Sequence, residues 1–591
     1  MTLRTLNELF YHVVERNFDR VLMIKRKNTW VSIPSRELYR DVVGVARALQ
    51  SWGVREGDRV AILSENRPEW AVTDFATMLL GATTVPIYAT LTTEQTLYLL
   101  RDSGARAIFV SSADQLRKVM EIKDRCSIEK IVVMDDVDAS GIVPMERLMR
   151  SGPDTRDAAI DLQALDVGPN ELATIIYTSG TTGTPKGAML THGNLASNVL
   201  HSLYLYPFEC GQVSISFMPL SHVFARHVDY VMLWHGVTVA YCPFHDELLS
   251  VIGDVKPHVF VAIPRVYEKM CNRVQSKFNG GVKRRLYDGA MRIGREHKHE
   301  VMAGNKPTAL PWRLADKLFF SKVRSALGGR VELFASGGAP LSREVLDWYA
   351  AIGIPIYEGY GLTETSPIIS VNNPKSCRAG SVGPVVKNIE IQVAADGEIL
   401  VKGPSIFKGY WNMPEETAAV FEGEWFHTGD VGYVDDAGFL YITDRKKDLC
   451  KTSGGKFISP QPIECKLRAS WLVEEVAIVA DRRNFPSAII VPSFPALEDW
   501  AKLNRVPFAS REELVATSQV FALYESIIAA VNKDLARFEK IKKFIVVPDE
   551  FSMASGALTP TMKLKRRFIE QRYSQELDQL YNNEAEALRA G

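Results

Sequence analysis

Short runs of β-branched and other apolar residues recur between residues 59 and 361, and amphipathic helical patterns separate them. Strands that are apolar on both faces and alternate with helices are typical of parallel sheets that helices cover on both sides. The pattern therefore predicts an α/β fold for this part of the chain. Its buried strands are expected at 59–64, 105–111, 130–136, 172–178, 237–242, 258–264, 331–338 and 354–361.

The sequence changes character from about residue 377. Short strands alternate with turn residues, as in "IEIQVAADGEILVKG", and Asp396–Gly397 and Asp435–Gly438 are typical hairpin turns. We expect a small antiparallel β subdomain at 377–443. It completes a large N-terminal domain over 1–443, because 591 residues are too many for one compact domain.

A second change follows at "DRKKDL", 444–449, where charged residues are typical of a linker. Beyond it, "EEVAIVAD" and "SAIIVPSF" predict strands, and a helical stretch near 510–538 precedes a charged helix from Leu564. The residues 450–591 therefore predict a smaller α+β C-terminal domain.

The charge balance and the cysteines exclude several classes of protein. The 70 basic and 70 acidic side chains give a net charge of +0, without the basic excess of a nucleic-acid-binding protein. Seven scattered cysteines without a CxxC pair argue against a disulfide framework. A basic-rich helical segment between 270 and 325 is typical of a solvated helix face, and no amphipathic helix with a strongly basic face stands out.

No membrane span is expected. The N-terminus lacks the pattern of a signal peptide, and the longest apolar stretch, 70–91, is interrupted by Asp74, Gly81 and Pro86. It predicts a buried helix followed by a strand. We expect a cytoplasmic protein and leave open a transient peripheral contact at the inner face of a membrane, as well as the oligomeric state, homodimer included.

The stretch "YTSGTTGTPKG", 177–187, places hydroxyl and glycine residues ahead of a lysine. It lacks the spacing of a Walker loop. Backbone N–H and hydroxyl groups in such a loop can still point toward phosphate oxygens, although a flexible surface loop is the alternative. Three more segments, "ASGGAPLS", "YEGYGLTET" and "HTGD", follow predicted strands, where ligands bind in doubly wound proteins.

Six segments in order resemble the adenylate-forming superfamily of acyl-CoA synthetases, luciferases and peptide-synthetase adenylation domains. They are "YTSGTTGTPKG", "FMPLSHVFAR", "VELFASGGAPLS", "YEGYGLTETSP", "EGEWFHTGDVGYVDDAGFLYITDRKKDLCKTSGGKFISPQPIE" and "LTPTMKLKR". "DRKKDL", "GGKFISPQPIE" and "LTPTMK" make the chain most similar to long-chain fatty-acid–CoA ligases. The resemblance implies two steps with ATP, Mg²⁺ and coenzyme A. A fatty carboxylate forms acyl-AMP and pyrophosphate, and coenzyme A then displaces AMP.

The resemblance also implies roles for individual residues around ATP. The β- and γ-phosphates would be held by the loop residues Thr178, Ser179, Gly180, Thr181, Thr182, Gly183 and Lys186. Glu364 would bind Mg²⁺ and Thr363 the α-phosphate. Tyr360 would stack on adenine beside Gly338, Glu358 and Gly359, and Asp430 would bind the ribose hydroxyls with Arg445 nearby.

Catalysis is assigned by the same resemblance to Lys563 and His222, together with Glu364. Lys447 matches a hinge position about which a mobile C-terminal domain rotates, and Lys447 and Lys451 would reach the nucleotide in one orientation. Ser453, Gly454 and Gly455 would approach coenzyme A after rotation. Read without the resemblance, Tyr360 could be a core aromatic residue, Asp430 a turn residue and His222 a helix cap.

Other functions remain open at this point. A fatty-acyl-AMP ligase would pass the acyl group to a carrier protein, and such relatives typically carry an insertion in the large domain. A CoA ligase for another carboxylic acid would share the motifs. A non-catalytic nucleotide-binding regulator would be expected to lack Glu364, Lys563 or Lys186, and the sequence retains all three.

Overall fold

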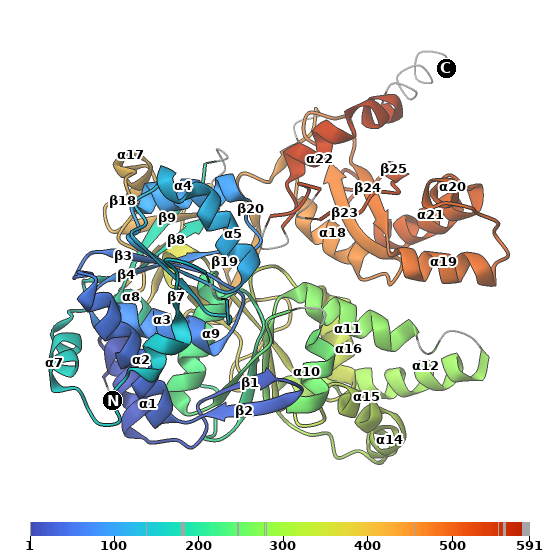
Figure 1. Ribbon diagram of the computed structural model, residues 1–591. Helices are drawn as coiled ribbons and strands as arrows, with labels where there is room; N and C mark the ends of the chain where they lie inside the picture. Colours follow the sequence, from blue (N-terminus) through green and yellow to red (C-terminus); the bar gives the residue numbers. More distant parts are fainter. Residues whose placement is uncertain are drawn as a thin grey trace.

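The computed structural model describes residues 2–137, 139–178, 184–244, 247–276, 278, 281–453, 456–552, 555–559 and 563–581. Two large, mostly parallel sheets lie side by side in the N-terminal part, and a smaller unit formed by the last residues stands beside them (Figure 1). The α/β prediction with a smaller α+β unit is confirmed.

The first large sheet has seven strands. Their spatial order is β7 (Val143–Pro144), β6 (Lys130–Val133), β5 (Ala107–Val110), β3 (Arg59–Leu63), β4 (Thr83–Ile87), β8 (Leu172–Thr178) and β9 (Lys186–Thr191). All neighbours are parallel except β8 and β9, which form an antiparallel pair.

The second large sheet has eight strands. Their order is β15 (Ile368–Val371), β14 (Ile356–Gly361), β13 (Leu333–Ser336), β12 (Val259–Ala262), β10 (Val213–Ser216), β11 (Thr238–Tyr241), β1 (Leu22–Arg26) and β2 (Thr29–Ile33). Antiparallel pairs occur at its two edges, β14 with β15 and β1 with β2. The eight strands predicted from apolar runs are all present; β8 has the predicted bounds and the other seven are somewhat shorter.

Helices cover both faces of these sheets because successive strand residues point to opposite sides. In β3, Val60 and Ile62 belong to the largest core, whereas Ala61 and Leu63 belong to a second core under α4 and α5. The helices of this part are α1 (Leu6–Glu15), α2 (Ser35–Ser51), α3 (Pro68–Leu79), α4 (Thr93–Ser103), α5 (Ala113–Ile122), α6 (Met145–Arg150), α7 (Ala158–Asp166), α8 (His192–Ser202), α9 (Val223–His235), α10 (Leu248–Val255), α11 (Pro264–Ser276), α12 (Gly281–Glu296), α13 (Lys298–Met302), α14 (Leu310–Ala315), α15 (Ser321–Ala326) and α16 (Arg343–Ala351).

A buried ion pair ties α9 to α3. Arg226 on α9 donates from Nε to Asp74 Oδ2 at 3.0 Å, and the Tyr230 hydroxyl donates to the same oxygen at 2.5 Å. Arg226 and Asp74 are both fully buried. Breaking such a pair leaves an uncompensated buried charge, so Arg226, part of "FMPLSHVFAR", has a structural role here.

An antiparallel sheet follows, as predicted. It contains β16 (Glu390–Val393), β17 (Glu398–Lys402), β18 (Phe421–Glu422), β19 (Trp425–Val434) and β20 (Leu440–Arg445), with the short helix α17 (Pro414–Ala418). Both predicted turns close hairpins, since Gly397 N–H donates to Ala394 and Gly438 N–H donates to Asp435.

The last unit is built on three strands, β23 (Val473–Val479), β24 (Ser487–Pro492) and β25 (Lys543–Val546). The other elements are β21 (Cys450–Lys451), β22 (Phe457–Ile458), α18 (Pro460–Arg468), α19 (Phe494–Leu503), α20 (Arg511–Val515), α21 (Ser518–Asn532) and α22 (Arg566–Arg572). Val476 and Ile478 face one core, and Ala477 and Val479 face another, so this sheet is also covered on both sides.

Two helix predictions need correction. The stretch 510–538 is not one helix, because Thr517 begins α21 by accepting a hydrogen bond from Val520 N–H. The helix predicted from Leu564 starts at Arg566, and Leu564 instead pairs with Leu558 in a β-bridge. All seven cysteines are free thiols. Among the described helices, none has the length and apolar character needed to cross a bilayer.

Candidate active site

The predicted phosphate loop connects the antiparallel strands β8 and β9. Thr178 ends β8 and faces Lys186, the first residue of β9. Ser179, Gly180, Thr181, Thr182 and Gly183 lie outside the described residues. The two described ends place the loop at the carboxyl end of β8, on the side where nucleotide ligands bind in α/β sheets.

A tyrosine, an aspartate and an arginine meet where β14, β19 and β20 come together. Asp430 on β19 lies directly opposite Arg445 on β20, and Arg445 Nε is 3.1 Å from Asp430 Oδ1. The Tyr360 hydroxyl donates to Asp430 Oδ2 at 2.6 Å. Burial raises the pKa of Asp430 and Arg445 opposes that shift. The geometry brings together two predicted ribose-site residues and the predicted adenine-site residue.

The strand that carries Tyr360 is closely packed on its neighbour. A Cβ on Gly361 would lie 1.7 Å from the Pro367 carbonyl oxygen, so no side chain fits there.

The other residues predicted around adenine lie on or beside the same strand. Gly338, after β13, has φ +83, a conformation that favours glycine. Glu358 accepts a hydrogen bond from Leu341 N–H at 3.2 Å, and burial raises the pKa of its carboxyl to about 7. Gly359 pairs with Val371 in the same ladder.

Glu364 is held by a residue that the sequence did not indicate. The Tyr410 hydroxyl donates to Glu364 Oε1 at 2.8 Å, and Lys186 Nζ lies 5.2 Å from the centroid of the Tyr410 ring. Tyr410 and Glu364 are 46 positions apart in the sequence, and no local pattern connects them. Thr363, buried in a short 3₁₀ turn, precedes Glu364.

The single carboxylate of Glu364 suits a Mg²⁺ ion that is bound together with the phosphates of a nucleotide. Within the described ranges, no group of three or more His, Cys, Asp or Glu side chains could hold a metal ion. A site with one carboxylate suits Mg²⁺, which takes its other ligands from water and phosphate oxygens.

Lys563 reaches this region from the C-terminal unit. A short loop holds it, because Thr559 N–H donates to the Lys563 carbonyl at 2.8 Å and Lys563 N–H donates to Thr559 Oγ1 at 3.0 Å. The side chain remains accessible to solvent, yet the surrounding protein lowers its pKa to about 8. Burial is the main cause and Arg445 adds to it, whereas Asp430 and Glu364 act in the opposite direction.

His222 caps a helix and lies close enough to Lys563 for the charge of that lysine to act on it. Its Nδ1 accepts a hydrogen bond from Phe224 N–H at 3.1 Å at the start of α9. Burial, with a smaller contribution from Lys563, lowers its pKa to about 4. The imidazole is therefore neutral at pH 7, and since Nδ1 is an acceptor, the proton lies on Nε2. The two interpretations of His222 are thus compatible.

Ion pairs hold the C-terminal unit against α11 of the large part (Figure 1). They are Arg265–Glu474 at 2.8 Å, Lys269–Glu474 at 3.1 Å, Arg265–Glu475 at 3.6 Å and Arg468–Glu268 at 3.9 Å. Arg265 also donates to the Glu474 carbonyl. This network fixes the orientation in which Lys563 lies near Asp430 and Glu364.

Family models match nearly the whole chain. Residues 10–411 match the model described as AMP-binding enzyme, and residues 447–585 match the AMP-binding enzyme C-terminal domain. The chain belongs to the AMP-binding enzyme family.

Individual relatives agree with this assignment. The long-chain-fatty-acid–CoA ligase FadD15 of Mycobacterium tuberculosis is 34% identical over 560 residues, which cover 94% of this chain and 93% of the relative. The long-chain-fatty-acid–CoA ligase 1 of Homo sapiens is 32% identical over 586 residues, with coverages of 94% and 82%. The solved A-PCP didomain of carboxylic acid reductase from Segniliparus rugosus, in complex with AMP, has a TM-score of 0.78 at 21% identity. It covers 99% of this chain and 83% of that one, and it shows the shared fold.

In this AMP-binding enzyme, the remaining predicted residues lie in the linker or just after it. They are Lys447, Lys451 and Ser453. The Lys451 ammonium lies 5.6 Å from the Phe457 ring centroid, and Lys447 is exposed. Ser453 Oγ donates to Asn484 Oδ1 at 2.7 Å, whereas Gly454 and Gly455 lie outside the described residues. The roles of Lys447, Lys451 and Ser453 therefore stay predictions.

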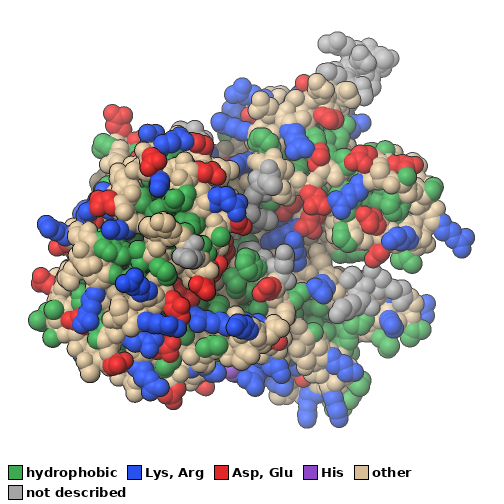
Figure 2. Space-filling view, in the orientation of Figure 1, with side chains coloured by type: hydrophobic (Ala, Val, Ile, Leu, Met, Phe, Trp, Pro, Cys, Tyr) green, Lys and Arg blue, Asp and Glu red, His purple; other side chains and the backbone are tan. Residues whose placement is uncertain are grey.

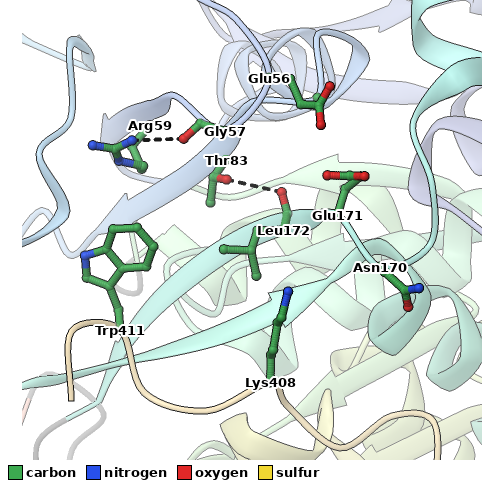
Figure 3. A pocket seen from close by; sticks show the side chains of 10 residues that line it. Glu56, Gly57, Arg59, Thr83, Asn170, Glu171, Leu172, Lys408 and Trp411 are labelled. Carbon is green, nitrogen blue, oxygen red and sulfur yellow. Dashed lines mark hydrogen bonds between the residues drawn. The ribbon is translucent and has the colours of Figure 1, made fainter. Parts of the chain in front are cut away.

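A hollow of about 210 Å³ lies elsewhere in the large part of the enzyme. Its wall includes Arg59, Thr83 and Leu172, the first residues of β3, β4 and β8, so it lies at the end of the sheet opposite Thr178. Figure 3 shows Glu56 and Glu171 on one side of this hollow and Trp411 on the other. Burial and the neighbouring Glu56 raise the pKa of Glu171. This hollow is separate from the candidate active site.

Proposed function

We propose that this enzyme activates a long-chain fatty acid with ATP and transfers the acyl group to coenzyme A. The observation that carries the proposal is the closeness of Lys563, in the C-terminal unit, to Asp430 and Glu364 of the large domain and to Arg445 of the linker, whose charges all act on the pKa of its ammonium group. The curated relatives, named as long-chain-fatty-acid–CoA ligases, support the substrate class.

In the first step, a fatty carboxylate oxygen attacks the α-phosphorus of ATP, and the bond to the pyrophosphate oxygen breaks. Negative charge on the carboxylate and α-phosphate oxygens must be neutralised for this attack. The Lys563 ammonium is the mobile cation that reaches the site, and with a pKa of about 8 it is mostly protonated at pH 7. His222, neutral at this pH, offers Nε2–H to the acyl carboxylate.

The nucleotide is positioned by groups that the fold already orders. Asp430 receives the ribose hydroxyls, since Tyr360 and Arg445 fix its two oxygens. The loop at 178–186 surrounds the β- and γ-phosphates. Glu364, oriented by Tyr410, would hold Mg²⁺, which would neutralise phosphate charge when bound. Positioning and charge neutralisation account for most catalysis of this type, so no protein nucleophile is needed.

In the second step, the thiolate of coenzyme A attacks the acyl carbonyl carbon and AMP leaves with the bonding electrons. The C-terminal domain, 450–591, would rotate about the linker 444–449 between the steps, with Lys447 at the hinge. Rotation would withdraw Lys563 and bring the segment at 453–455 to the acyl-adenylate.

Pyrophosphate and AMP release test the proposal. Carboxylic acids of increasing chain length, with an aromatic acid for comparison, are offered with and without coenzyme A. We expect pyrophosphate release with long-chain acids and AMP release only when coenzyme A is added. Pyrophosphate release without AMP release after coenzyme A is added would favour a ligase that uses another acceptor. No AMP release with any acid would refute the function.

Two lysine variants test whether Lys563 acts in adenylation and not in thioester formation. Lys563→Ala should slow adenylation by about 10²- to 10³-fold, because it removes the charge that reaches the transition state. It should leave thioester formation from preformed acyl-AMP close to the wild-type rate. Lys565→Ala, two residues further along the chain, is the matched control and should alter neither step. Equal losses in both steps for Lys563→Ala would contradict the assignment.

A further inference from the structure

Helix α8 carries two buried asparagines one turn apart. Figure 2 shows lysine, arginine, aspartate and glutamate side chains spread over the surface of the molecule, where water solvates them. Asn194 and Asn198 differ from these side chains, because they are only 9% and 0% exposed. Residues four apart lie on the same face of a helix. A buried amide is costly unless its donor and acceptor are hydrogen-bonded, so the partners of these two side chains show what this face of α8 holds.

Asn198 holds the backbone of the turn that follows Glu364. Its Nδ2 donates to the Ile368 carbonyl at 2.8 Å and, with a longer bond of 3.5 Å, to the Thr365 carbonyl. Its Oδ1 accepts from Ile368 N–H at 3.1 Å. One end of the amide therefore meets only carbonyl oxygens and the other end an N–H group, a combination that only an asparagine or glutamine side chain can match. Because Thr365 is the next residue after Glu364, this contact fixes the chain that carries the Glu364 carboxylate.

Asn194 holds a second segment in the same way. Its Nδ2 donates to the carbonyls of Pro404 and Ile406 at 2.8 and 2.9 Å. Its Oδ1 accepts from the N–H of Thr191, the residue that begins α8, at 2.9 Å. Both bonds from Nδ2 reach a part of the chain that is more than 200 positions away. The segment that starts at Pro404 is thus attached to the first turn of α8.

The segment 404–411 in turn holds Glu364 from the other side. Phe407 N–H donates to the Glu364 carbonyl at 2.8 Å, and the Tyr410 hydroxyl donates to the Glu364 carboxylate. Met189 of β9 exchanges two backbone hydrogen bonds of 3.0 Å with the same segment. Glu364 is therefore fixed through its carboxylate, through its own carbonyl and through the residues that follow it.

β9 and α8 form one continuous piece of chain beside the phosphate loop. β9 begins at Lys186, the described end of that loop, and runs to Thr191, which caps α8 by accepting a hydrogen bond from Asn194 N–H at 3.1 Å. The phosphate loop and the turn of Glu364 are thus attached to the same unit, although the bonds from Asn198 span 167 and 170 positions. This unit sets the distance between the two.

We propose that Asn194 and Asn198 are positioning residues, which place the Glu364 carboxylate, and so the Mg²⁺ that it would hold, relative to the phosphate loop. They act through the backbone at 365–368 and 404–407 and do not themselves touch the nucleotide. Groups that orient a metal ligand typically change metal affinity by 10- to 100-fold when they are removed. The inference rests on the proposed function for the role of Glu364, but it does not depend on which acid is activated.

Binding of Mn²⁺ in the presence of ATP, without a fatty acid, tests the inference without any turnover. Mn²⁺ prefers the same oxygen ligands as Mg²⁺, and its EPR signal reports the free ion. We expect Asn198→Ala to weaken Mn²⁺ binding by about tenfold or more and Asn194→Ala by a smaller factor, since Asn194 acts through a longer chain of contacts. The Mg²⁺ concentration for half-maximal adenylation should rise in proportion, whereas the KM for the fatty acid at saturating Mg²⁺ should not change.

The matched control is Asn7→Ala on α1. Asn7 is also 0% exposed, and its Nδ2 donates to the Met78 and Ala164 carbonyls at 3.0 and 2.9 Å. The control therefore removes an equally buried amide that joins two carbonyls far along the chain, and thermal unfolding compares its stability with that of the other variants. It should bind Mn²⁺ like the wild type. An equal loss in Asn7→Ala would attribute the effect to general destabilisation and overturn the inference.

A double-mutant cycle with Glu364→Gln separates positioning from other effects. Glu364→Gln removes the carboxylate that the asparagines place, so Asn198→Ala should add little further loss of Mn²⁺ binding in that background. Additive losses, or an unchanged Mn²⁺ affinity in Asn198→Ala, would overturn the inference, as would a wild type that binds Mn²⁺ no tighter than ATP alone does.

The remaining outcomes are also distinguishable. If Asn198→Ala does not fold, the same cycle with Asn194→Ala decides. Failure of the proposed function would show differently, as an absence of coenzyme A-dependent AMP release with every acid, while the Mn²⁺ affinities of the wild type and the asparagine variants still differed.

Discussion

Removal of the Arg265 side chain should separate the two half-reactions. Arg265, whose side chain is 14% exposed, pairs across the domain boundary with Glu474 at 2.8 Å and with Glu475 at 3.6 Å. Both pairs join the two domains in the orientation described here, and the proposed rotation would break them. At about 1 kcal/mol for each partly exposed pair, their loss should disfavour that orientation by about 2 kcal/mol.

A free-energy change of this size corresponds to about a thirtyfold shift between the two orientations. In the proposed mechanism adenylation needs Lys563 in place, so its rate in Arg265→Ala should fall by up to about thirtyfold. The same mechanism assigns thioester formation to the other orientation, so this step should not slow. The assay measures pyrophosphate release for the first step and acyl-CoA formation from preformed acyl-AMP for the second.

Controls distinguish a shifted orientation from general damage. Lys25→Ala breaks a pair with Asp254 at 2.7 Å that lies within the large domain, and it should change neither rate. Arg265→Glu should be more severe than Arg265→Ala, and Glu474→Arg in the same chain should restore part of the lost adenylation. Equal slowing of both steps, or no recovery in the charge-reversed pair, would refute the reasoning.

Two further variants test the local geometry of the site. Tyr410→Phe removes the hydroxyl that holds Glu364 and keeps the ring beside Lys186, so the Mg²⁺ concentration for half-maximal adenylation should rise by roughly tenfold. Tyr11→Phe, which loses a similar bond to Asp161 far from the site, should leave it unchanged, and a normal Mg²⁺ dependence in Tyr410→Phe would count against the contact. Gly361→Ala would place Cβ 1.7 Å from a carbonyl oxygen and should lower the free energy of unfolding by about 1–3 kcal/mol, as measured by denaturation. Gly289→Ala, with open space around its Cβ, is the control and should not be destabilised, so equal stability of the two variants would contradict the packing argument.

The strands were predictable because the alternation of their side chains between two faces shows in a few consecutive residues. Val60 and Ile62 face one core and Ala61 and Leu63 face the other, so an uninterrupted apolar run was enough to indicate a strand buried on both sides. The helix bounds were less predictable. Thr517 interrupts one helix by capping the next, and Leu564 leaves the helix pattern to pair with Leu558.

The site was predictable only as separate segments. "YEGYGLTET" and "HTGD" indicated Tyr360 and Asp430, but their hydrogen bond joins residues 70 positions apart. Tyr410 carried no local signal at all. The pairing of Arg265 with Glu474 was equally hidden, because a surface ion pair and an interdomain one look alike in a sequence.

The electrostatics of Lys563 predict that nucleotide binding takes up protons. In the free enzyme, burial and the nearby Arg445 lower its pKa to about 8, so at pH 8 the amine is charged in about half of the molecules. A bound triphosphate places negative charge nearby and raises that pKa again. Binding at pH 8 should therefore take up about half a proton, and affinity for ATP should fall as the pH rises above 8.

Calorimetry in two buffers of different ionisation enthalpy measures this uptake directly. Lys563→Arg should abolish it, because an arginine stays charged throughout this range. The wild type should show little uptake at pH 6.5, where Lys563 is already protonated. In the proposed mechanism, the departure of pyrophosphate removes most of the added negative charge and leaves only the α-phosphate of acyl-AMP near Lys563. The repulsion between Lys563 and Arg445 is then less well offset. The first product to leave would therefore also weaken the contact that keeps the domains in the proposed adenylating orientation. Proton uptake that persists in Lys563→Arg would assign the titrating group elsewhere and remove this link between chemistry and rotation.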